Sequence, residues 1–304
     1  MLTLLKSVAH PMKRLSRMAC ISACASVALA QSEITVGDSG VGEIDSATIG
    51  YQIRSRFDAA YGADKINRGE YIWASPAAVG NGPRNVESNV DYQTVSTYLE
   101  YALSSQFSVF VQGGFLAVNP RLNSNASGTR DVQAGFKYGL IQESDTLVTF
   151  QMKFYAESGE ADRGLGTGHF SVEPGILFLR QYDYFVLEGE LKQWTAIDGT
   201  DPFQGTLIQY GLGASTNLEP WGLPDVRPVV ELFGWSFFDG QTRYQNAAGA
   251  VITEDASGDT IINARIGTRL DLTDTTDLYL GHGWALTDEQ LYEDMFRVEL
   301  RLAF

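Results

Sequence analysis

Apolar and polar residues alternate with a period of two through most of the chain after about residue 47. In the last segment, Phe296 and Val298 fall on one face, while Arg297 and Glu299 fall on the other. This alternation is typical of β-strands with one apolar and one polar face. The pattern predicts strands at 47–58, 91–103, 107–117, 130–140, 147–155, 169–180, 184–195, 206–216, 227–238, 259–272, 277–286 and 294–304.

The connections between these segments alternate in length. Short connections at 104–106, 141–146, 181–183 and 273–276 alternate with long ones at 59–90, 118–129, 156–168, 196–205 and 239–258. Short turns at one rim and long loops at the other are typical of outer-membrane barrels. In lipid every backbone N–H and C=O must be paired, which favours closure. We therefore predict an all-β fold, a closed antiparallel transmembrane β-barrel of about 12 strands over residues 47–304.

The alternation also assigns the two faces of each strand. In 147–155, Phe150 and Met152 face outward, and Gln151 and Lys153 face inward. A basic side chain facing lipid at the bilayer midplane would cost roughly 2–4 kcal/mol, so the charged face is the lumen. The two stretches 229–235 and 279–284 are apolar in both phases, which leaves their faces open. The predicted pore-lining residues are Arg54, Arg56, Lys137, Lys153, Glu173, Glu188, Glu190, Arg265, Arg269, Arg297, Glu299 and Arg301.

These inward charges divide into two walls. Arginines of the first, tenth and twelfth segments form a basic wall, and Glu173, Glu188 and Glu190 form an acidic wall opposite. One interpretation is a transverse field across an open lumen, which would orient polar solutes. The other is a closed barrel filled by mutually neutralising salt bridges. Twelve strands lie between the filled eight-stranded barrel and the open sixteen-stranded porin, so strand number does not decide.

The first thirty residues differ from the rest. Four basic residues and no acidic ones precede an apolar stretch that ends in Ala28-Leu29-Ala30. This pattern is typical of a cleaved signal peptide over 1–30, which predicts export. Cys24 lies in a loose lipobox, which leaves lipidation as an alternative. Residues 31–46 are predicted to be a short periplasmic segment, too short for a plug domain.

Composition limits the kinds of partner and cofactor that the sequence predicts. Loss of the signal peptide would change the formal net charge from −15 to −19 and remove both cysteines. This acidity argues against nucleic acid, and the missing thiols exclude disulfides and cysteine-bound metals. No cofactor motif is present. A mean hydropathy of −0.11 without an apolar stretch near twenty residues excludes a helical membrane bundle. Acidic residues gather in four predicted loops, 156–168, 196–205, 239–258 and 287–293. These acidic loops are solvated tips or sites of divalent-cation bridging to lipopolysaccharide.

Two histidines are candidates for chemistry. His169 and Ser171 lie two residues apart on a predicted strand, hence on one face. The pair resembles the His-x-Ser of a twelve-stranded outer-membrane phospholipase, which would imply lipid hydrolysis. Val172-Glu173-Pro174 stands where that family has Asn-Gly, and the pair is predicted to face the lumen, so we favour a non-enzyme. His282 is isolated, and no metal site is predicted there.

The chain ends on an alternating strand with an aromatic last residue, Phe304. This resembles the C-terminal signature of bacterial outer-membrane barrels, which implies recognition by the barrel-assembly machinery. A second likeness runs from Asp131 to Tyr138, with Gly164 to Gly168 and Glu173-Pro174-Gly175 downstream. These segments resemble a family of outer-membrane channels linked to the meta-pathway of phenol degradation. That resemblance implies uptake of small molecules, with aromatic compounds among the candidates.

The sequence therefore predicts an outer-membrane protein of a Gram-negative type of bacterium, surrounded by lipid and lipopolysaccharide. The favoured function is a channel for passive passage of small solutes through a charged lumen. One alternative is a closed structural or adhesion barrel that presents acidic loops. A second is a lipid hydrolase that uses His169 and Ser171.

Overall fold

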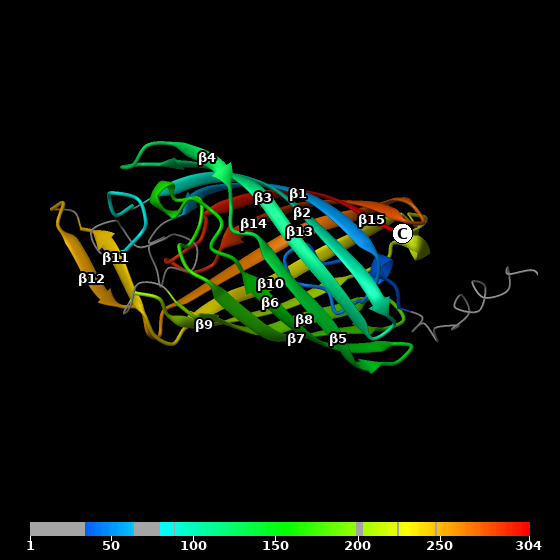
Figure 1. Ribbon diagram of the computed structural model, residues 1–304. Coiled ribbons are helices and arrows are strands. Elements are labelled where there is room, and N and C mark those ends of the chain that lie inside the picture. Colours follow the sequence, from blue (N-terminus) through cyan, green and yellow to red (C-terminus); the bar gives the residue numbers. More distant parts are fainter. Residues whose placement is uncertain (1–33, 64–79, 88, 199–202, 224, 247) are drawn as a thin grey trace, which may run out of the picture. The chain divides into compact units, whose positions relative to one another are not determined.

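The computed structural model describes residues 34–63, 80–87, 89–198, 203–223, 225–246 and 248–304 (Figure 1). The proposed signal peptide and lipobox lie outside the described residues and remain predictions. So do residues 31–33 and most of the predicted loop 59–90.

The described chain is built almost entirely from strands. They are β1 (Gln52–Ala63), β2 (Val90–Ser104), β3 (Phe107–Pro120), β4 (Ala126–Thr129), β5 (Gln133–Gln142), β6 (Thr146–Tyr155), β7 (Ser171–Gln181), β8 (Val186–Ala196), β9 (Thr206–Ser215), β10 (Val226–Phe237), β11 (Gln241–Gln245), β12 (Val251–Asp255), β13 (Thr260–Thr273), β14 (Thr276–Ala285) and β15 (Asp294–Ala303). Short 3₁₀ helices are η1 (Val36–Asp38), η2 (Ala161–Arg163) and η3 (Glu219–Trp221). Among the described residues, no helix has the length and apolar character needed to cross a membrane.

Neighbouring strands pair antiparallel into one closed sheet. β1 pairs with β2 on one side and with the last strand, β15, on the other. All of the thirteen strands in this sheet except β4 form the closed barrel, which gives the twelve-stranded wall visible in Figure 1. β4 pairs only with the C-terminal part of β3, from Phe115 to Val118. β11 and β12 form a separate hairpin. The predicted closed antiparallel barrel is confirmed.

The two rims differ as predicted. At one rim the turns β2–β3, β5–β6, β7–β8 and β13–β14 are short; we call this the short-turn rim. At the opposite, long-loop rim lie the connections that carry β4, η2 and the β11–β12 hairpin. Because β1 starts and β15 ends at the short-turn rim, the barrel carries its two ends there (Figure 1).

Burial along the strands follows the predicted phase. In β6, Gln151 and Lys153 are buried, whereas Phe154 is exposed outward. The stretches left open are now assigned: Phe233 and Trp235 of β10 face inward, and Leu232 faces outward. In the same way Tyr279 of β14 is fully buried inside. Phe233 and Trp235 belong to an apolar cluster in the long-loop half of the lumen, with Trp194, Leu207, Leu291, Tyr292 and Met295.

The structure differs from the prediction at the start of the barrel. β1 begins at Gln52 rather than at residue 47, and residues 34–50 do not form a periplasmic segment. Instead they lie inside the barrel, where Ala47 and Thr48 offer their carbonyl oxygens to Thr149 Oγ1 and Lys137 Nζ of the wall. We call residues 34–50 the luminal segment. They lack a strand partner, so their backbone groups are satisfied by side chains that point inward.

Candidate functional site: the lumen

The luminal segment forms a loop inserted through the short-turn rim. Ile34 and Ala47 pack together against Leu177 and Leu179 near that rim. The two arms also meet at the base, since a Cβ on Gly50 would lie 3.8 Å from the Cβ of Val36. The apex of the loop is Glu43–Asp45, which reaches the middle of the barrel.

Arginines of the wall bind the carbonyl oxygens of one arm. Gly40 and Val41 accept hydrogen bonds from Arg269, at 3.1 and 2.8 Å. Ser39 accepts one from Arg301 at 2.9 Å. Gly42 accepts from both Arg56, at 2.8 Å, and Arg297, at 2.5 Å. These donors come from β1, β13 and β15, which is the basic wall expected from the sequence.

Carboxylates of β8 and β10, the latter paired directly with β13, bind the N–H groups of the same arm. Glu188 of β8 accepts from Gly40 and Val41, at 2.9 and 3.3 Å. Glu231 of β10 accepts from Gly42, Glu43 and Ile44, at 3.1–3.2, 2.8 and 3.1 Å. Glu190 accepts from Asp45 at 2.9 Å. The backbone of this arm therefore lies between two sets of side chains, with carbonyls bound by the arginines and amides bound by the acids, all in charge-assisted hydrogen bonds.

The two acidic side chains at the apex are also held. Glu43 pairs with Arg265 and Arg297, both at 2.6 Å, and Asp45 pairs with Lys153 at 2.9 Å and Lys192 at 3.1 Å. Burial would raise the pKa of Glu43, but Arg297 and Arg265 outweigh it and lower the pKa to about 2. Burial would also raise the pKa of Asp45, but Lys153 and Lys192 outweigh this effect. The pKa of Asp45 therefore lies well below its usual value. The apex thus carries two ionised carboxylates at neutral pH.

Several of the remaining charges of the lumen are paired within the wall. Arg56 and Arg269 both reach Glu299, at 2.7 and 3.1 Å, and Arg269 and Arg301 share Asp277. Lys137 pairs with Glu100 at 3.0 Å. Burying such charges is costly unless each has a partner.

Every predicted pore-lining residue is placed on the inward face. Lys137, Lys153, Glu173, Glu188, Glu190, Arg265, Arg269, Arg297, Glu299 and Arg301 are buried, and Arg54 and Arg56 are half-buried. Arg54 lies 4.0 Å from the ring centre of Tyr98, and Glu173 pairs with Lys153 at 3.2 Å. The expected gap between the walls is occupied by the luminal segment.

Sequence reasoning missed several members of this network. The wall residues overlooked are Asp58, Glu100, Lys192, Glu231 and Asp277, and those of the luminal segment are Glu43 and Asp45. Glu231 lies in a stretch that was ambiguous in phase. Its neighbours Phe233 and Trp235 are inward and apolar, which hid the alternation.

Two cavities lie on the long-loop side of the apex, and both touch Glu43 and Trp235. One, of about 130 Å³, is polar and is lined by Arg56, Lys153 and Lys192. The other, of about 190 Å³, is lined mainly by apolar and aromatic groups of the internal cluster. The lumen thus changes from charged and rich in ion pairs in its middle to partly apolar toward the long loops.

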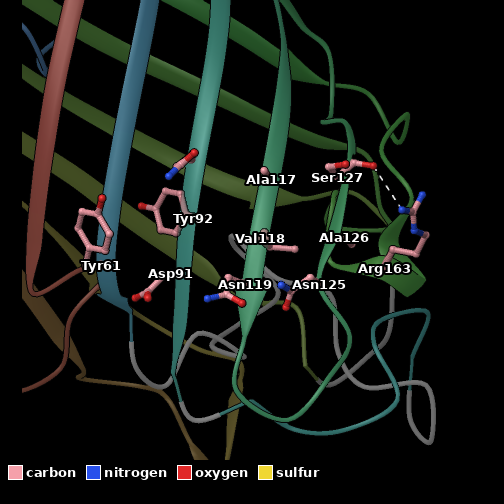
Figure 2. Close-up of a pocket in the computed structure, with 11 residues that line it drawn as sticks. Tyr61, Asp91, Tyr92, Ala117, Val118, Asn119, Asn125, Ala126, Ser127 and Arg163 are labelled. Carbon is pink, nitrogen blue, oxygen red and sulfur yellow. Dashed lines mark hydrogen bonds between the residues drawn. The ribbon is translucent and has the colours of Figure 1, made fainter.

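A third hollow, of about 470 Å³, lies at the long-loop rim beside β1–β4 (Figure 2). Tyr61, Asp91 and Asn119 line it, together with Asn125. Arg163 closes one side, donating to the carbonyl oxygen of Ser127 at 3.3 Å. Asp91 is engaged as well, because it accepts the N–H of Gly62 at 2.9 Å. This third hollow is separate from the charged middle of the lumen.

The histidine candidates are both engaged in local contacts. His169 Nδ1 lies 3.0 Å from Ser171 Oγ, so the predicted pair does meet. Both residues are buried, with 1% and 0% of their surface exposed. His282 faces outward, lies 2.8 Å from Asp294 Oδ1 and stacks on Phe296. Within the described ranges no group of three or more His, Cys, Asp or Glu could hold a metal ion.

Comparison with known proteins agrees on architecture. The COG4313 outer membrane channel from Pseudomonas putida F1 is 14% identical, with a TM-score of 0.57 over 87% of this chain and 99% of that one. The fold is that of an outer-membrane β-barrel. The NanC porin is 8% identical, with a TM-score of 0.50 over 84% of this chain and all of that one. The β domain of the Bordetella autotransporter BrkA is 10% identical, with a TM-score of 0.51 over the same shares.

Below the level of fold the comparisons are silent. No family model matches the chain, and no curated protein matches it either. The resemblance to the phenol-degradation channels is therefore not confirmed.

Proposed function

We propose that this protein is a channel for passive passage of small solutes across the outer membrane, with the short-turn rim on the periplasmic side. One observation carries the proposal: the barrel wall encloses a bore wide enough to hold the luminal segment. That stretch is held mainly by hydrogen bonds and ion pairs, not by a packed apolar core. A bore that admits a peptide is also wide enough for a small solute.

The outer surface supports the proposed location. Outward positions on the strands are large and apolar, for example Val95, Leu99, Phe115 and Ile266, all at least 40% exposed. Such a surface is unfavourable in water and favourable in lipid. Inward arginines and glutamates keep their charges away from the hydrocarbon.

The proposed route begins at the long-loop rim. A solute would reach the two cavities first and then the apex of the luminal segment at Glu43. Further passage requires this segment to shift toward the periplasm, because its arms fill the short-turn half. No energy source is needed, since the solute moves down its own gradient.

One observation favours the alternative of a closed barrel. Most charges of the wall are paired with one another or with the luminal segment, as expected for a filled lumen. A closed barrel would carry no current, so conductance separates the two functions. The hydrolase alternative depends on the His169–Ser171 contact alone.

A disulfide latch tests the channel and its obstruction together. A Cβ at Gly211 would lie 2.8 Å from Ile44 Cγ1, within reach of a disulfide, so Ile44→Cys/Gly211→Cys would tie the apex to β9. In planar bilayers we expect channel currents from the reduced protein and a large decrease on oxidation. The matched control, Val36→Cys/Gly50→Cys, closes the base of the loop on itself and leaves the wall free.

The outcomes are distinct. If neither the wild type nor the reduced variants carry current above background, the channel is refuted and the closed barrel stands. If oxidation of the apex latch leaves the current unchanged, solutes do not pass the luminal segment.

A further inference from the structure

We propose that the larger luminal cavity is a binding site for small monocarboxylates with a compact apolar body, and that Arg130 binds the carboxylate. The proposal deepens the proposed channel function by naming a class of solute. It concerns the cavity of about 190 Å³ on the long-loop side of Glu43. That volume is below the roughly 300–1,000 Å³ of pockets for drug-sized ligands, so the ligand must be small.

The body of the ligand would meet apolar walls. Tyr92 of β2, Trp235 of β10 and Tyr292, which precedes β15, line the cavity with Leu291 and Met295. These side chains belong to, or pack against, one apolar cluster. Flat aromatic walls bury large areas of a compact apolar group.

The other charges that line the cavity already have partners. Arg297 donates hydrogen bonds to both carboxylate oxygens of Asp58, at 2.6 and 2.9 Å. Arg297 also binds Glu43, which is shared with Arg265. These groups therefore neutralise one another, and none of them calls for a counter-ion.

Arg130 differs from them. Within the described part of the chain, its guanidinium lies within ion-pair distance of no carboxylate, although it lines the cavity. Its backbone N–H donates to Gly114 of β3 at 3.1 Å. Its stem runs across the same residue, where a Cβ would lie 3.2 Å from Arg130 Cδ. Glycine at this inward position thus makes room for the side chain beside the wall.

An unpaired guanidinium beside an apolar cavity selects for an anion. The planar fork of arginine matches the two oxygens of a carboxylate. A cation would be repelled by Arg130, and Glu43 and Asp58 are already occupied by arginines. A neutral analogue of the same shape would keep the apolar contacts and lose the charged one.

Titration calorimetry on the full protein in detergent tests this site with benzoate and its neutral analogue benzamide as probes. We expect benzoate to bind more tightly than benzamide to the wild type. Arg130→Gln should weaken benzoate binding about tenfold to a hundredfold and leave benzamide unchanged. Arg130→Lys keeps the charge and should lose less. The matched control is Arg180→Gln, at the short-turn rim, where an exposed arginine pairs with Asp145.

The proposal is overturned if benzoate does not bind, if benzamide binds as tightly as benzoate, or if Arg130→Gln binds benzoate like the wild type. The comparison of the two probes on the wild type needs no variant, so misfolding of Arg130→Gln cannot hide the answer. The channel is judged separately: binding without current refutes the channel and leaves this site, and current without binding does the reverse.

Discussion

Neutralising Glu43 should release the luminal segment from the barrel wall. Glu43 is the single apex residue that bonds to both Arg265 and Arg297, each at 2.6 Å. Replacing it with glutamine removes the charge and keeps the size. Arg265 is then left buried with a weaker partner, so the inserted state loses stability relative to a withdrawn one.

The magnitude follows from the pKa of Glu43. This pKa falls from 4.5 to about 2 in the inserted state. At 1.36 kcal/mol per pKa unit, the charge favours insertion by about 3 kcal/mol. Glutamine still accepts a hydrogen bond from a guanidinium, which recovers part of this. We therefore expect the withdrawn fraction to increase about tenfold to a hundredfold.

Thiol labelling measures that fraction. The chain has no cysteine after Cys24, so Ile44→Cys introduces the one thiol of residues 31–304, the part that remains once the predicted signal peptide is removed. Ile44 is 2% exposed, and a maleimide can reach position 44 only when the segment withdraws. The labelling rate of Ile44→Cys/Glu43→Gln is compared with that of Ile44→Cys at neutral pH.

Asp38→Asn supplies the control. It removes the same charge from the same segment, but the Asp38 carboxylate accepts hydrogen bonds from Thr35 and none from the wall among the described residues. Its labelling rate should stay within about twofold of the parent. Equal rates for Glu43→Gln and the parent would refute the electrostatic anchoring of the apex.

Three further outcomes are expected. The pKa of Glu43 is lowered, so its contribution to the stability of the inserted segment is complete above about pH 4.5 and is lost as the pH falls through about 2. Bilayer conductance of the wild type should therefore rise as the pH falls over that range, and that of Glu43→Gln should rise less. Deletion of Phe304, whose ring lies 5.9 Å from that of Tyr51, should lower the amount of heat-modifiable barrel in the outer membrane several-fold and leave refolding in detergent intact. Wild type and Ser171→Ala should release equal, background amounts of fatty acid from phospholipid, because His169 and Ser171 are buried; release lost in the variant would establish the hydrolase.

The strands could be predicted because lipid imposes a strict rule on them. A membrane-spanning wall must alternate its faces, so most strands of the barrel show their phase in the sequence. The rule fails where the lumen itself is apolar. Phe233 and Tyr279 face inward, as charged residues do elsewhere, which made the phase of β10 and β14 ambiguous.

The luminal segment could not be predicted for a different physical reason. Its contacts with the wall are made largely by backbone N–H and C=O groups, which every residue carries. Sequence pattern therefore says little about where such a segment lies. The clue that was present is the excess of inward charge on the wall, since arginines and glutamates in one lumen need partners. Glu43 and Asp45 could have been recognised as such partners.

The hydrogen bonds between the luminal segment and β15 also set an order of assembly. The segment precedes every strand, yet Arg301 donates to Gly37 from 264 residues further along the chain. Contacts of such long range form late in folding. The anchoring of the luminal segment is therefore completed only when the last strand closes against β1, and a chain truncated before β15 would leave Gly37, Ser39 and Gly42 without the donors of that strand. The full set of hydrogen bonds to this segment thus forms only in the completed barrel.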